Sequence, residues 1–83
     1  MNFSNLASES SKLPSMTGVT FGDDSMSVSL SDGRIISIPL AWYPRLASAN
    51  DKQLSRYEIS PGGYGIHWPD LDEDLSVRGF LFP

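Results

Sequence analysis

Apolar and polar residues alternate most clearly over residues 25–30, where methionine, valine and leucine are each preceded by a serine. A period of two is typical of a strand that buries one face. A turn signal at residues 31–33 and a second apolar segment at residues 34–40 follow, which predicts a β-hairpin. Val19 and Phe21, before a turn of two aspartates, indicate one further strand.

The hydrophobic pattern selects one register for this hairpin. A two-residue loop would mix apolar and polar residues on each face of the pair. A loop of residues 31–33 instead pairs Val28 with Ile36 and keeps one face apolar, provided that Gly33 adopts the left-handed conformation of a G1 bulge. We therefore predict the longer loop, and we expect Ile35, on the opposite face, to be partly covered.

The middle of the chain predicts two short helices. Trp42, Leu46 and Ala49 have helical spacing, which favours a helix over about residues 43–49 with its proline in the first turn. A second helical segment is expected at residues 51–55, with its aspartate as the N-cap.

The last third predicts a second hairpin. Residues 57–60 alternate, residues 61–63 are a strong turn signal, and residues 64–68 form the expected partner strand. An aspartate and a glutamate at capping-box spacing then favour one helical turn at residues 71–75. We expect the apolar residues 80–82 to dock on the domain.

Together these elements predict a single α+β domain, with a small antiparallel sheet, β-hairpins and one or two short helices. With 83 residues the chain has room for one domain and a small core. The serine-rich residues 1–15 have no regular apolar spacing, so we expect a flexible leader, followed by the domain at residues 16–83. A short helical turn around Leu6 is the alternative for the leader.

Composition excludes several classes of function. The chain has no cysteine and one histidine, which excludes disulfides, a catalytic thiol, Cys-based metal sites and most zinc chemistry. Ten acidic and six basic residues give a net charge of −4, which argues against direct nucleic-acid binding. No signal-peptide pattern and no membrane-spanning apolar stretch is visible, so we expect a cytoplasmic protein.

Candidate chemistry is sparse, and we expect neither an enzyme nor a cofactor. His67 and Asp70 could belong to a Ser-His-Asp triad, but no serine lies in a nucleophile-elbow sequence. The acidic run from Asp70 fails as an EF-hand loop because Leu75 and Leu81 occupy the positions of the required glycine and glutamate. Incidental metal binding there remains the alternative to helix capping and a negative surface patch.

Aromatic and charged residues instead suggest a surface that binds a protein. Tryptophan and tyrosine are enriched at the energetic centres of protein interfaces, and complementary charge speeds association with a basic partner. The predicted interaction face consists of Trp42, Tyr43, Arg45, His67, Trp68, Asp70, Asp72, Glu73 and Asp74.

Three segments carry a family resemblance: LSDGRIISIPL at residues 30–40, WYPRL at residues 42–46 and GIHWPDLDED at residues 65–74. In order and spacing they resemble domain-of-unknown-function family 2442, a group of small, mostly bacterial and phage-associated proteins. The resemblance covers about residues 17–81 and implies a compact α+β domain with an antiparallel sheet. The family offers no established catalytic residues to carry over.

The resemblance also bears on partners. Family members often stand beside a second small protein in an arrangement similar to toxin–antitoxin operons, which implies a protein partner encoded by a neighbouring gene. We therefore expect a non-enzymatic interaction module, either antitoxin-like or an inhibitory partner of a small basic protein. The alternative is a nucleic-acid-associated regulator, since some relatives carry an added helix-turn-helix, for which this chain has no residues left over. A homodimer is also open, because sheet edges and exposed aromatic residues can pair across an isologous interface.

Overall fold

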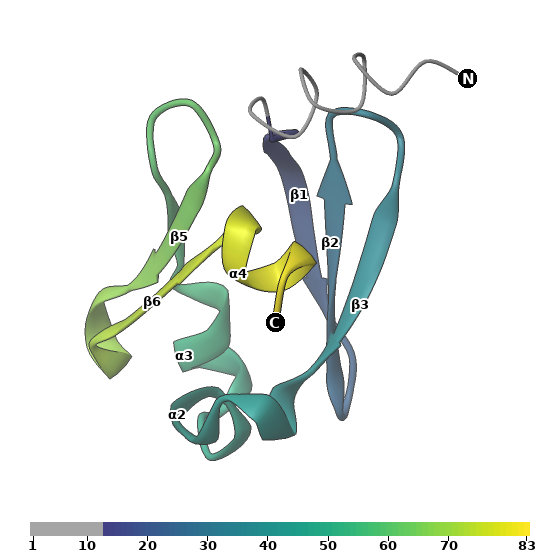
Figure 1. The fold of residues 1–83 in the computed structure, drawn as a ribbon. Helices are drawn as coiled ribbons and strands as arrows, with labels where there is room; N and C mark the ends of the chain where they lie inside the picture. Colours follow the sequence, from purple (N-terminus) through teal and green to yellow (C-terminus); the bar gives the residue numbers. More distant parts are fainter. Residues whose placement is uncertain (1–12) are drawn as a thin grey trace, which may run out of the picture.

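The computed structural model describes residues 13–83, which fold into two three-stranded antiparallel sheets connected by short helices (Figure 1). Sheet A has the order β1 (Met16–Phe21), β2 (Ser25–Leu30), β3 (Ile35–Pro39). Sheet B has the order β4 (Glu58–Ile59), β5 (Gly65–Trp68), β6 (Glu73–Ser76). The α+β class expected from the sequence is confirmed, with the strands divided between two sheets.

Five short helices complete the part of the chain that the structure describes. Two of them are 3₁₀ helices, each directly after a strand of one of the sheets. The 3₁₀ helices are η1 (Leu40–Trp42) and η2 (Pro69–Leu71), and the α-helices are α2 (Pro44–Ala47), α3 (Asp51–Ser55) and α4 (Val77–Leu81).

The β2–β3 hairpin has the predicted register. Val28 lies opposite Ile36, and the Gly33 N–H donates to the Leu30 carbonyl at 3.0 Å with Gly33 at φ 94°. The expectation for Ile35 is wrong, because this side chain is 69% exposed. The cause is visible in Figure 1, where sheet B and the described helices all lie on the other side of sheet A.

Helix α3 has the predicted bounds but a different cap. Asn50 is the N-cap, and its side chain and that of Gln53 form a reciprocal capping box with N–O distances of 2.8 and 3.0 Å. The predicted cap, Asp51, is already the first helical residue. Helix α2 is shorter than predicted, because the chain turns out of the helix at its C-cap Ser48.

The predicted helical turn at residues 71–75 is wrong. The turn forms earlier, as η2, and β6 follows it and pairs with β5. Asp72, with φ 51°, separates the two elements. Pairing with β5 puts Leu75 opposite Ile66, where both contribute to the apolar side of sheet B. This burial outweighs the local capping preference of the acidic residues.

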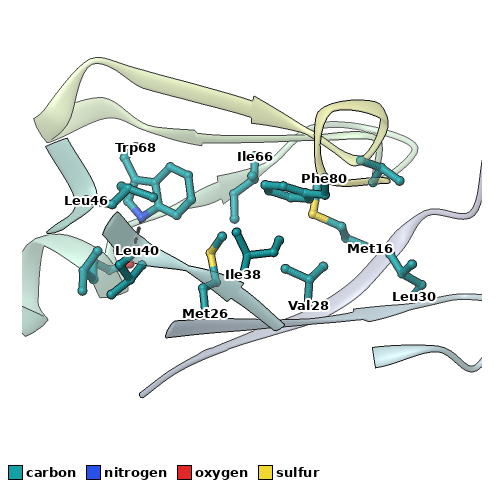
Figure 2. Packing of buried hydrophobic residues seen from close by; sticks show 12 residues of the cluster. Met16, Met26, Val28, Leu30, Ile38, Leu40, Leu46, Ile66, Trp68 and Phe80 are labelled. Atoms are coloured by element: carbon teal, nitrogen blue, oxygen red, sulfur yellow. Dashed lines mark hydrogen bonds between the residues drawn. The ribbon is translucent and has the colours of Figure 1, made fainter. Parts of the chain in front are cut away.

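The hydrophobic core lies between the two sheets, and Figure 2 shows side chains of sheet A pointing toward those of sheet B. Trp68 is fully buried, and its indole N–H donates to the Leu54 carbonyl at 3.0 Å. At the other end Phe80 of α4 lies beside Met16, so part of the predicted C-terminal docking is present as a helix. The core residues are Met16, Met26, Val28, Leu30, Ile38, Leu40, Leu46, Leu54, Ile66, Trp68, Val77 and Phe80.

One backbone contact joins the first strand of sheet A to the β4–β5 loop. The Met16 N–H donates to the Gly63 carbonyl at 2.7 Å. Gly63 has φ 81°, and a Cβ built on it would lie 2.8 Å from the Ser15 Cβ. Only glycine therefore fits this approach without a shift. Residues 1–12 of the predicted leader lie outside the described residues, whereas Leu13 packs partly against the core.

Candidate interaction surface

An exposed tryptophan stands at the end of η1. Trp42 is 54% exposed, while the next residue, Tyr43, is half-buried against Phe80 in an edge-to-face contact with 6.5 Å between ring centroids. Burial, and secondarily the negative charge of Glu73, raises the pKa of Tyr43 above its usual value. This charge effect indicates that β6 comes close to the corner between η1 and α2.

Two arginines attach the acidic segment to the helices. Arg45 of α2 donates a hydrogen bond to the Asp72 carbonyl, and its guanidinium nitrogen lies 4.0 Å from the Asp72 carboxylate. Arg56, the C-cap of α3, lies 3.4 Å from a carboxylate oxygen of Asp70. All four side chains are largely exposed, so each ion pair orients its carboxylate but adds little stability.

The last two acidic residues of the run point in opposite directions. Glu73 and Asp74 are neighbours on β6, and successive side chains of a strand alternate between its faces. Asp74 lies opposite His67, with 2.6 Å between its carboxylate and Nδ1 of the imidazole, and His67 lies opposite Glu58. These three residues form a row across the outer face of sheet B, beside a shallow hollow of about 400 Å³.

The predicted face is therefore divided between two surfaces. We call the first the helix-side surface, and the second, made of Glu58, His67 and Asp74, the outer row. The helix-side surface consists of Trp42, Tyr43, Arg45, Arg56, Asp70, Asp72 and Glu73.

Trp68 has to be removed from the predicted face. Its side chain has no exposed area and packs with Phe21 and Tyr57, at centroid distances of 6.5 and 6.4 Å. The physical reason is its position on the inner face of β5, one residue after the outward-facing His67.

Sequence reasoning missed Arg56 and Glu58. Arg56 and Asp70 follow the two residues that the hydrogen bond from the Trp68 indole to the Leu54 carbonyl joins, and the sequence has no local signal for this contact. Glu58 could have been found, because pairing the alternating residues 57–60 with residues 64–68 puts it on the same face as His67.

The chemistry available within residues 13–83 is limited. No group of three or more histidine, aspartate or glutamate side chains there has the arrangement needed to hold a metal ion. Nδ1 of His67 contacts the Asp74 carboxylate and, at 3.1 Å, the Glu73 carbonyl, and no described serine hydroxyl hydrogen-bonds to its ring. In that part of the chain, no helix is long and apolar enough to cross a membrane.

The fold and this surface define a small α+β domain of two packed three-stranded sheets. More particularly, the chain belongs to a family described as a protein of unknown function, DUF2442, whose model matches residues 16–83.

Two solved structures are similar. A protein of unknown function from Rhodospirillum rubrum shares 32% identity over 84% of this chain and 87% of its own, with a TM-score of 0.72. An uncharacterized protein from Chromobacterium violaceum, at 23% identity, shares the fold over 95% of this chain and 74% of its own, with a TM-score of 0.71. No curated protein matches the chain.

Proposed function

We propose that this protein is a cytoplasmic, non-enzymatic interaction module whose helix-side surface binds a small basic protein, as an antitoxin-like or inhibitory partner. The observation that carries the proposal is the exposed Trp42 beside the half-buried Tyr43. A tryptophan that keeps more than half of its area in water gains stability when a partner covers it, and tryptophan is enriched among the residues that dominate binding energy.

Charge supports a basic partner. The chain carries a net charge of −4, and three acidic residues of the helix-side surface stand against two arginines. Arg45 binds the backbone carbonyl of Asp72, and Arg56 lies 3.4 Å from the Asp70 carboxylate, so the two arginines orient the acidic segment before a partner arrives. Complementary charges at the rim of such a surface increase the association rate and orient the encounter.

The experiment is an affinity capture from the source cells with three forms of the chain: wild type, Trp42→Ala and Tyr64→Ala. Tyr64 is the matched control, because it is also a half-exposed aromatic residue but lies in the β4–β5 loop, outside the helix-side surface. We expect one stoichiometric basic protein with the wild type and Tyr64→Ala, and its loss by at least about tenfold with Trp42→Ala.

Two results would contradict the proposal. Equal retention of the partner by all three forms would remove the helix-side surface from binding. Nucleic acid in the eluate without a protein partner, detected by staining, would favour the alternative, a nucleic-acid-associated regulator. The purified partner, titrated against the chain at increasing salt, should bind more slowly as charges are screened.

A further inference from the structure

Hydrogen bonds beside both ends of β3 determine which of its residues direct their backbone groups toward β2. Beside the hairpin loop, the Leu30 N–H donates to the Arg34 carbonyl at 2.8 Å. At the far end the Leu40 N–H donates to the Asp24 carbonyl at 2.9 Å. Facing residues of an antiparallel ladder alternate between bonded and non-bonded pairs. Every second residue of β3, beginning with Ile35, therefore directs its backbone N–H and C=O away from β2.

These outward groups form a free edge. Within residues 13–83, no hydrogen bond is made by the backbone N–H or C=O groups of Ile35 and Ser37, whereas the carbonyl of Pro39, the N-cap of η1, belongs to the first turn of that helix. Pro39 has no N–H to offer. In Figure 1, β3 is the strand of sheet A farthest from sheet B. An edge of this kind is a template for another strand.

The other edges are less suited to pairing. The outward edge of β1 already contacts the sheet B side, through the Val19 carbonyl and the Tyr57 hydroxyl at 3.5 Å. β4 has only two residues, and β6 carries Glu73 and Asp74, so a second acidic strand there would meet like charge. The five residues of β3 include no charged side chain.

We infer that two copies of this chain pair through antiparallel β3 strands, so that sheet A continues across a two-fold axis at Ser37. In this register the Ser37 N–H of each copy donates to the Ser37 carbonyl of the other. The Ile35 N–H of each copy faces the Pro39 carbonyl of the other, which accepts the first bond of η1 and has a second lone pair for this donor. The pairing is isologous, as a closed dimer requires.

Side chains favour the same register. Ile35, the most exposed large apolar residue of the described chain, comes opposite Pro39 of the second copy, so that both lose contact with water. The contact area of one short strand belongs to the smallest class of specific interfaces, so the dimer is weak and reversible. We expect a dissociation constant on the order of 100 μM.

The test is sedimentation equilibrium of the full chain from about 10 μM to about 1 mM, a range that brackets this dissociation constant. Ser37→Pro removes the central donor, and Ile35→Lys leaves the backbone intact but adds a charge at the edge. Thr20→Lys is the matched control, because it adds the same charge to the same exposed sheet face on β1. We expect the wild type and Thr20→Lys to dimerise, and both β3 variants to dissociate at least about tenfold more readily.

Amide hydrogen exchange gives a second measurement that does not depend on the variants. The Ser37 amide of the wild type should become more protected as concentration rises, and core amides should not change. A wild type that stays monomeric at about 1 mM, or a dimer that survives in both β3 variants, would overturn the inference. Trp42→Ala should dimerise normally, so this inference and the proposed partner binding fail independently.

Discussion

Sheets A and B each have three antiparallel strands, but the two sheets differ in the side chains that their strands carry. The strands of sheet A contain no charged residue, and β2 alternates buried apolar residues with serines. Sheet B has shorter strands and carries Glu58, His67, Glu73 and Asp74. Sheet A consists of two consecutive hairpins with long strand pairings, in which the register of β1 with β2 shifts between Met16 and Gly18. The strand pairings of sheet B are shorter.

The difference shows how a short sheet is stabilised. Sheet B is connected to the rest of the domain by contacts far apart in sequence, such as the Trp68 indole with the Leu54 carbonyl and Arg45 with Asp72. A sheet with a two-residue strand does not hold itself together in water. Sheet B therefore depends on its attachment to the helices and to sheet A.

The largest expected effect is at the main anchor of sheet B. Trp68→Ala should lower the free energy of unfolding by about 3–5 kcal/mol, because it leaves a cavity and frees the Leu54 carbonyl. Urea denaturation measures the change. Trp42→Ala, at an exposed position, is the control and should change stability by no more than about 0.5 kcal/mol. Similar losses for the two variants would mean that Trp68 is not the anchor.

A smaller loss is expected where sheet A meets the β4–β5 loop. Gly63→Ala should cost about 2–4 kcal/mol, because the new Cβ combines positive φ with a 2.8 Å approach to the Ser15 Cβ. Gly33→Ala also has positive φ but meets nothing within 4 Å, so about 1 kcal/mol is expected. Thermal unfolding of both variants gives the comparison. If Gly33→Ala costs as much, the contact between the two regions adds nothing.

The smallest effect tests the charged surface of sheet B directly. A double-mutant cycle with His67→Ala and Asp74→Ala should give a coupling energy of about 0.2–1 kcal/mol, because both side chains are partly exposed. The same cycle at Ser27 and Ser37, which face each other in sheet A, should give less. Coupling as large at the serines would show that charge is not what distinguishes the two sheets.

The same comparison explains which parts of the fold could be predicted. The register of β2 with β3 follows from local alternation and one turn glycine, so the sequence is sufficient for it. Local alternation does not predict which face of sheet A is covered by the rest of the domain. Ile35 and Ile38 are both isoleucines of β3, yet Ile38 is buried and Ile35 is exposed. The reason is that, within the described chain, sheet A is covered by other elements on one face only.

The structure of sheet B was harder to predict, because the local helix preference of its acidic residues disagrees with the burial that strand pairing provides. Acidic residues after Pro69 favour a helix start, yet β6 forms because it places Leu75 beside Ile66, where Leu75 packs against the core. The sequence predicted one continuous face, and the structure divides its residues between two surfaces and the core. Strand alternation separates Glu73 from Asp74 on β6 and buries Trp68 on β5.

The hydrogen bond between Met16 and Gly63 also has a consequence for the order of folding. It joins residues far apart in sequence, so the chain loses loop-closure entropy before the contact can form. The β2–β3 hairpin, in contrast, closes through a loop of three residues, 31–33. We expect the transition state to contain this hairpin and to lack the Met16–Gly63 contact, with higher φ-values at Val28 than at Met16. The edge strand β3 would then be formed, and open to a second chain, before sheet B has docked.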